Sequence, residues 1–75
     1  MNTAYEFSLA MSYQEFTEIY YGGGAQQLVV TSTNGTRVAI PAGRMVPFVD
    51  SRGVRGLFRL TVDQNHKFVA LERLR

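Results

Sequence analysis

The sequence predicts an α+β domain with a five-stranded, mostly antiparallel twisted sheet and one helix, in the order β-α-β-β-(short turn)-β-β. Three observations predict this fold: an alternating apolar segment at the start, a helix start just after it, and two later pairs of apolar runs that each flank a turn. So small a sheet twists strongly, which leaves a partial barrel open as a variant of the fold. We expect one globular domain over residues 1–75.

The first strand follows from an alternating pattern. Over residues 4–11 every second residue is apolar, and the residues between them are polar or small. A period of two residues is typical of a strand with one buried face. We therefore expect one side of this strand to enter the core with the side chains of Tyr5, Phe7, Leu9 and Met11.

The helix is predicted from its first turn. Ser12 and Glu15 have the spacing of a capping box, in which each side chain accepts a hydrogen bond from the other residue's backbone N–H. We expect the helix to run over residues 13–21, and the glycines at 22–24 to end it in the left-handed conformation. Its core-facing side is expected to carry Tyr13, Phe16, Ile19 and Tyr20.

The clearest hairpin signal lies in the middle of the chain. The β-branched runs at residues 27–33 and 36–40 flank Asn34 and Gly35, a residue pair typical of a type I′ turn. Pro41 is expected to end the second run, because proline has no N–H to donate to a sheet.

A second hairpin is predicted near the end of the chain. Residues 57–62 and 68–74 are apolar runs joined by a polar turn. The apolar segment before them, residues 42–53, is expected to cross one end of the core, with at most one helical turn around residues 44–46 because Pro47 opposes a longer helix. In the first strand of this hairpin the inward side chains are expected to be Phe58, Leu60 and Val62.

Charge is distributed unevenly along the chain, although the net charge is only +2. Residues 1–36 contain three glutamates and no lysine or arginine, whereas residues 37–75 contain all eight basic residues and three acidic ones. Such asymmetry can mark an anion-binding face, although a solvated surface explains it as well. One hypothesis is therefore nucleic-acid binding through Arg37, Arg44, Arg52, Arg55, Arg59 and Lys67.

Residues 51–60 could serve this hypothesis, because arginines there surround two glycines. Arginine binds phosphate oxygens in pairs, and glycine lets a phosphate approach the backbone. The stretch matches the RNA-recognition strand motif only at Arg55 and Gly56, and Leu57 replaces the first stacking aromatic residue. We interpret the segment as a turn that leads into a strand with arginines on its polar side.

The sequence contains no arrangement typical of catalysis. His66 is the only histidine and lies in a predicted turn, the carboxylates are scattered, and the chain has no cysteine. We expect a non-enzymatic protein without a metal or cofactor. The favoured hypothesis is a protein-interaction module, self-associating or with a partner still to be identified, that uses a strand edge or an apolar patch of Met45, Val46 and Phe48.

The order of short motifs along the chain resembles a known bacterial family. The motifs "SYQEF", "NGTRV", "IPAGRMVPFV", "GVRGLFRL" and "NHKFVALERL" are similar, in this arrangement, to the family called domain of unknown function 2835 (DUF2835). The resemblance implies a short bacterial protein in the cytoplasm, and it implies no activity or site residue. The N-terminal segment lacks the pattern of a signal peptide or a membrane anchor, which agrees with that location.

Overall fold

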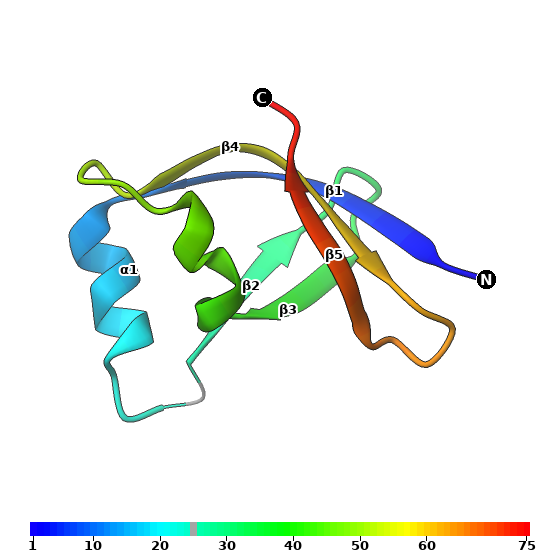
Figure 1. The fold of residues 1–75 in the computed structure, drawn as a ribbon, viewed down its shortest axis with the longest axis horizontal. Helices are drawn as coiled ribbons and strands as arrows, with labels where there is room; N and C mark the ends of the chain where they lie inside the picture. The colour runs from blue at the N-terminus through cyan, green and yellow to red at the C-terminus, as the bar shows by residue number, and fades with distance from the viewer. Residues whose placement is uncertain (25) are drawn as a thin grey trace.

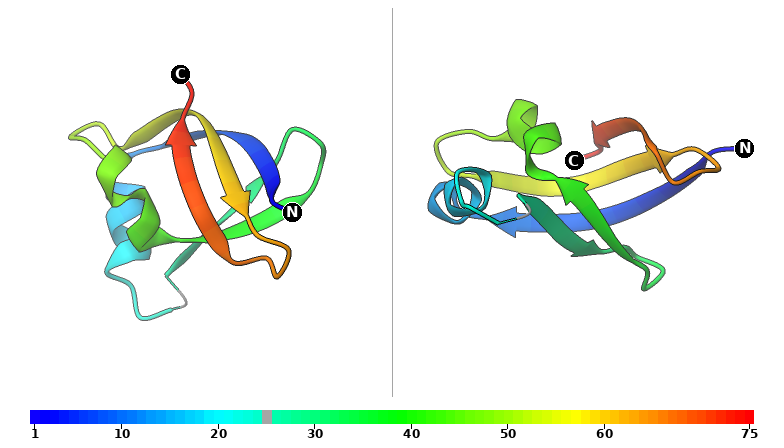
Figure 2. Two further views of the ribbon diagram at one scale, coloured as in Figure 1. Left: turned by 45° about the vertical axis from the view of Figure 1, so that its right-hand side comes forward. Right: turned by 90° about the horizontal axis from the view of Figure 1, so that it is seen from below.

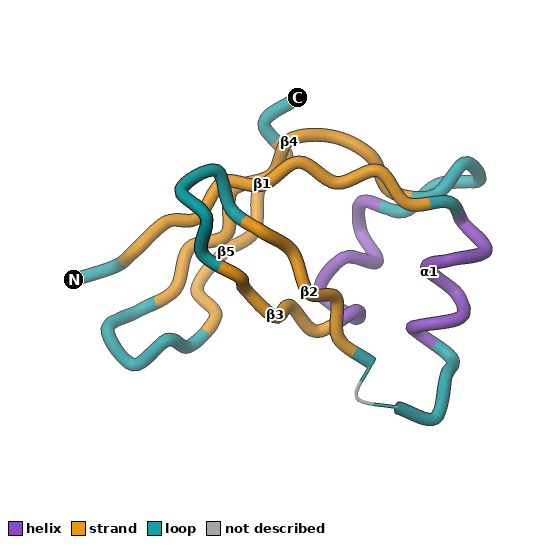
Figure 3. Tube along the Cα trace, turned by 180° about the vertical axis from the view of Figure 1, so that it is seen from behind, coloured by secondary structure: helices purple, strands orange, loops and turns teal. Residues whose placement is uncertain are grey.

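A computed structural model describes residues 1–24 and 26–75 of the chain. These residues form five strands, one α-helix and one 3₁₀-helix, which Figure 1 shows from the front and Figure 3 from behind. In chain order the elements are β1 (Thr3–Met11), α1 (Tyr13–Tyr20), β2 (Gln27–Thr31), β3 (Arg37–Pro41), η1 (Ala42–Phe48), β4 (Val54–Val62) and β5 (Phe68–Arg73).

The strands form two antiparallel sheets, so the prediction of one five-stranded sheet is wrong. One sheet has the order β1-β4-β5, and β2 pairs with β3 in the other. In the described part of the chain a single backbone hydrogen bond joins them, from the N–H of Thr33 to the carbonyl oxygen of Glu6 (2.7 Å). The β2–β3 hairpin therefore diverges from β1, and the strands do not close into a barrel (Figure 2).

The core lies between the two sheets and is closed at one end by α1 and η1. Phe7 and Phe58 stack on neighbouring strands with ring centroids 5.5 Å apart, and Phe48 of η1 meets Phe58 edge to face at 5.4 Å. Such aromatic pairs stabilise a core beyond the area that they bury. The inward positions predicted for β4 are confirmed, since Phe58, Leu60 and Val62 are all buried.

The capping box at the start of α1 is confirmed. The N–H of Glu15 donates to Ser12 Oγ, and the N–H of Ser12 donates to Glu15 Oε1, both over 3.1 Å. Phe16 is buried beneath the helix. The prediction for Tyr13 is wrong: its side chain is 51% exposed, because the first turn of α1 lies at the edge of the molecule (Figure 1).

The helix ends by a mechanism that the sequence did not predict. None of the glycines at 22–24 has a positive φ angle, so the left-handed glycine cap is wrong. Gln26 adopts φ 57° instead, and its side-chain amide donates to the carbonyl oxygen of Tyr20 (2.8 Å). A glutamine side chain thus satisfies a helix carbonyl that would otherwise lack a partner.

The central hairpin is confirmed, but its turn differs from the predicted type I′. A type I′ turn needs positive φ at both central residues, and here only Gly35 (φ 90°) has it, not Asn34. The N–H of Gly35 donates to the carbonyl oxygen of Ser32 (2.9 Å), and Asn34 Oδ1 accepts the N–H of Thr36 (3.1 Å). The connection is therefore longer than the predicted two residues: β2 ends at Thr31 and β3 begins at Arg37, which leaves residues 32–36 between the strands.

Residues 51–60 form a turn that leads into a strand, as predicted. Asp50 and Gly53 exchange two backbone hydrogen bonds of 2.9 and 3.0 Å, and β4 begins at Val54, earlier than expected. The preceding segment forms the 3₁₀-helix η1, longer than the single predicted turn, and this helix contains Pro47.

Candidate functional site

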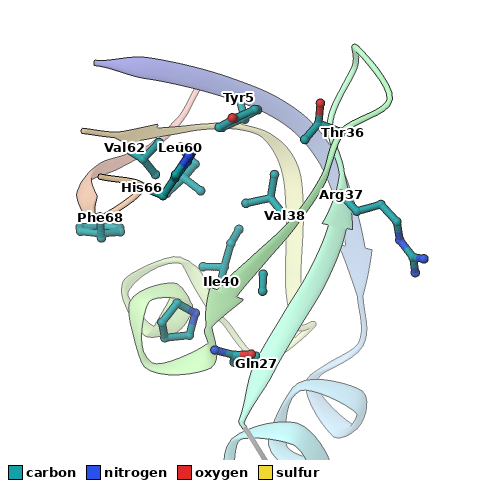
Figure 4. Close-up of a pocket in the computed structure, with 12 residues that line it drawn as sticks. Tyr5, Gln27, Thr36, Arg37, Val38, Ile40, Leu60, Val62, His66 and Phe68 are labelled. Carbon is teal, nitrogen blue, oxygen red and sulfur yellow. The ribbon is translucent and has the colours of Figure 1, made fainter. Parts of the chain in front are cut away.

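A groove of about 510 Å³ lies between the β2–β3 hairpin and the three-stranded sheet. Its walls come from segments far apart in sequence: all five residues of β3 line it on one side, and β1, β4, β5 and the β4–β5 turn line it on the other. Figure 4 shows Val38 and Ile40 pointing from β3 toward Leu60 of β4. The side chains inside the groove are mostly apolar, as in many binding sites.

The backbone pairing of β3 can be assigned from hydrogen bonds at the two ends of the hairpin. The N–H of Ser32 donates to the carbonyl oxygen of Thr36 (2.8 Å), and the N–H of Ala42 donates to the carbonyl oxygen of Gln26 (2.8 Å). In an antiparallel pair, hydrogen-bonded and non-hydrogen-bonded residue pairs alternate along the strands. The register of the hairpin therefore fixes which residues of β3 bond to β2.

This alternation leaves backbone groups of β3 without a strand partner. Val38 and Ile40 occupy hydrogen-bonded positions and direct their N–H and C=O groups toward β2. Arg37 and Ala39 occupy the intervening positions, so their N–H and C=O groups face the free edge of the strand. Because all five residues of β3 line the groove, this edge borders it.

The outer edges of the three-stranded sheet are less regular. In β5 the register shifts opposite Thr61 and Val62, so that Val69 is an extra residue that interrupts the edge. In β1 the carbonyl oxygen of Glu6 already accepts the N–H of Thr33. Bulges and covered groups are ordinary protections against unwanted strand pairing. Among the described residues, the edge of β3 contains no bulge, and no other segment forms backbone hydrogen bonds with it.

Basic side chains lie around the groove. Arg44 of η1 lies over the ring of Phe68, with its Cζ atom 4.2 Å from the ring centroid, and Phe68 lines the groove. Arg37 lines the other end, and Figure 4 shows its side chain directed away from the cavity. Lys67 follows His66, a lining residue, in the β4–β5 turn. Of the twelve lining residues in the described chain, none is an aspartate or a glutamate.

The structure does not bring the six predicted basic residues to one face. Arg55 and Arg59 lie on the side of β4 opposite to buried Phe58, facing away from the core. Arg59 donates to Glu6 Oε2 (3.1 Å) in an ion pair between neighbouring strands. Arg52 lies in the turn before β4, where its N–H donates to Asp50 Oδ1 (2.8 Å). Arg37, Arg44 and Lys67 are the members of the set that lie near the groove.

The apolar patch predicted from three residues is divided by the fold. Met45 is fully buried in the core and Phe48 packs on Phe58, whereas Val46 is 44% exposed. Of the three residues of the predicted patch, Val46 is therefore the one that is exposed. The role of these residues in closing the core agrees with the expectation that segment 42–53 covers one end of it.

The carboxylate of Asp63, in the turn beside the groove, has a structural role. Asp63 Oδ1 accepts the backbone N–H groups of Asn65 (2.8 Å) and Lys67 (3.0 Å), which holds the β4–β5 turn in shape. His66 has φ 62° in that turn. Within residues 1–24 and 26–75, no three histidine, cysteine, aspartate or glutamate side chains are grouped closely enough to bind a metal ion.

The fold defines a small α+β domain built from a three-stranded and a two-stranded antiparallel sheet. The chain belongs to the family described as "Protein of unknown function (DUF2835)", whose model matches residues 3–74. No match was found among curated proteins or among solved structures. None of the helices formed by the described residues has the length and apolar character needed to span a bilayer.

Proposed function

We propose that this protein is a non-enzymatic protein-interaction module that binds an extended peptide segment along the edge of β3. The observation that carries the proposal is the free backbone edge at Arg37 and Ala39 beside an apolar groove. Strand addition uses such an edge for main-chain hydrogen bonds and a neighbouring groove for alternate side chains of the partner. The fold thus supplies both parts of this recognition mode in one place.

The position of the side chains supports a strand as the occupant. Val38 and Ile40 point into the groove, and a residue paired opposite each of them would point the same way. The partner would bury two apolar side chains separated by one outward residue. The apolar walls supplied by Leu60, Val62 and Phe68 would receive them.

Nucleic-acid binding through an arginine-rich face remains the alternative, and it has less support. It needs basic residues in one place, whereas Arg55 and Arg59 lie on a different side of the molecule from Arg44. Arg59 also pairs with Glu6.

A cytoplasmic location is part of the main proposal, and fractionation of cells that express the tagged protein would check it.

The proposal can be tested by closing the edge of β3 with a single substitution. Proline at position 39 removes the N–H that a partner would use, and this N–H takes no part in the pairing of β3 with β2. Peptides would first be selected from a displayed random-sequence library on the unaltered protein. We expect Ala39→Pro to weaken their binding at least tenfold, about the loss of one net hydrogen bond.

The matched control is Ala39→Thr, which changes the same exposed position but keeps the N–H and suits a strand. We expect this variant to bind the selected peptides as the unaltered protein does. Circular dichroism would show that both variants are folded. Equal binding by the folded Ala39→Pro variant, or a selection that yields no binding peptide, would refute strand addition at β3.

A further inference from the structure

The chemistry around the groove points to the kind of segment that would bind there. Basic side chains lie at both ends of β3. Arg37 is the first residue of the strand, and Arg44 comes three positions after Pro41, its last residue. The twelve described residues that line the groove include no carboxylate. Asp63, a carboxylate of the neighbouring turn, is bonded to backbone N–H groups of that turn.

We propose that the partner segment is acidic, with carboxylates on both sides of a short apolar core. This inference rests on the proposed strand addition and specifies its occupant. The order along the segment would be an acidic residue, an apolar residue, any residue, an apolar residue and a second acidic residue. The pattern reads the same in both directions, so it holds for parallel and for antiparallel pairing with β3.

The first carboxylate would meet Arg37. Residues directly opposite each other in a sheet have their side chains on the same face. Since the side chain of Arg37 is directed away from the cavity, the residue opposite it would also lie on that outer face. A guanidinium and a carboxylate placed across two strands form a favourable pair. Within the described ranges Arg37 takes part in no ion pair, so its charge is available to a partner.

The second carboxylate would meet Arg44. The five residues of β3 span about 13 Å, so a segment that pairs along them reaches from Arg37 to the beginning of η1. The ring of Phe68 covers one face of the Arg44 guanidinium and fixes its position next to the groove. The N–H groups at the edge of the guanidinium plane stay free to donate to a carboxylate.

The partner's charge can be tested with three synthetic peptides that share a Val-Thr-Val core. Two glutamates, two lysines or two serines flank the core on each side. Binding would be followed by fluorescence anisotropy and by shifts of the Arg37 and Ala39 amide signals in NMR titrations. We expect the glutamate peptide to bind about tenfold more tightly than the lysine peptide, as two exposed charge pairs would give. Added salt should reduce this preference.

A charge reversal at one position provides the stricter test. Arg37→Glu should remove the preference for the glutamate peptide, because the reversed charge at position 37 offsets the charge pair that remains at Arg44. Arg55→Glu is the matched control, because it makes the same change on an exposed residue of β4 that faces away from the core. We expect this control to keep the original preference, so that a general effect of net charge is distinguished from a local one.

The outcomes separate this inference from the function on which it rests. Equal binding of the glutamate and lysine peptides, both lost in Ala39→Pro, would refute the acidic partner and leave strand addition intact. Failure of all three peptides to shift the Arg37 and Ala39 signals, with salt-sensitive binding of a labelled single-stranded oligonucleotide instead, would refute both. The inference is upheld by a glutamate preference that Arg37→Glu removes and Arg55→Glu does not.

Discussion

Gly53 lies against the backbone at the end of β1: a Cβ atom added to it would be 2.6 Å from the carbonyl carbon of Ser12 and would overlap the carbonyl oxygen of Met11. Gly53 also has φ 112°, which residues with a side chain rarely adopt. The turn before β4 therefore passes β1 at a distance that only glycine permits. This requirement explains one of the two glycines that lie among the arginines of residues 51–60.

Gly53→Ala is expected to destabilise the protein by about 3 kcal/mol or more, because it combines backbone strain with a clash against main-chain atoms that cannot move aside. Urea unfolding followed by circular dichroism would measure the change. Gly43→Ala is the matched control, since nothing lies within 4 Å of the added atom there. We expect this control to raise stability by about 0.5 kcal/mol. Similar effects at both positions would contradict the close approach.

Ser12→Ala is expected to lower the free energy of unfolding by about 1 kcal/mol, the usual effect of losing an N-cap hydroxyl. In a domain of this size, the loss corresponds to a melting temperature about 5 °C lower. Differential scanning calorimetry would measure it. Ser51→Ala, at an exposed turn position, serves as the control and should change little. An unchanged melting temperature in Ser12→Ala would show that the cap contributes no stability.

Glu15 is expected to make the capping box depend on pH. The backbone N–H of Ser12 bonded to its carboxylate, and secondarily the Ser12 side chain, lower the pKa of Glu15 from its ordinary value of 4.5. A carboxylate whose pKa is lower in the folded state than in the unfolded state stabilises the fold at any pH above its pKa in the unfolded state. This stabilisation is lost as the pH falls through its pKa in the folded state. The stability difference between the unaltered protein and Glu15→Gln should therefore be larger at neutral pH than well below pH 4.5.

Glu18→Gln provides the comparison for this pH series, because it removes a carboxylate from the same helix that takes no part in the capping box. Urea unfolding at each pH would be measured for both variants. A Glu15→Gln difference that stays constant from neutral to acidic pH would contradict an ionised capping carboxylate.

The edge of β3 should be visible in the free protein by amide hydrogen exchange. We expect Val38 and Ile40 to exchange slowly, because β2 accepts their N–H groups, and Arg37 and Ala39 to exchange quickly, because their N–H groups face solvent. The two pairs alternate along one short strand and serve as controls for each other. Slow exchange at all four residues would mean that another strand already covers this edge, as in self-association.

Local signals in the sequence predicted the elements well. The spacing of Ser12 and Glu15 predicted the start of α1, and the runs around Gly35 predicted a hairpin. The end of α1 and the turn of the central hairpin were predicted wrongly, because both depend on hydrogen bonds from side chains to the backbone. Gln26 takes a left-handed conformation and caps the helix with its side chain, and the Asn34 side chain replaces a second left-handed residue in the hairpin turn.

The arrangement of the sheets and the groove could not be predicted in the same way. Whether the β2–β3 hairpin continues the sheet beyond β1 depends on contacts between segments that are distant in sequence. Among the described residues, the two sheets share a single backbone hydrogen bond, from Thr33 to Glu6. The groove likewise combines β1 and β3–β5. The basic set was predicted from composition, but the alternation of β4 turns Arg55 and Arg59 away from the groove.

The pairing of β1 with β4 also determines when this chain can fold. Glu6 and Arg59, which meet across these strands, are 53 positions apart, whereas the β2–β3 hairpin closes over neighbouring residues and can form in about 1–10 μs. At a synthesis rate of about 5–20 residues per second, β1 emerges from the ribosome several seconds before its partner. During that interval the edge of β1 that pairs with β4 has no strand to accept or donate its backbone hydrogen bonds. The N-terminal strand is therefore the segment that nascent or truncated chains would expose to chaperones and to aggregation.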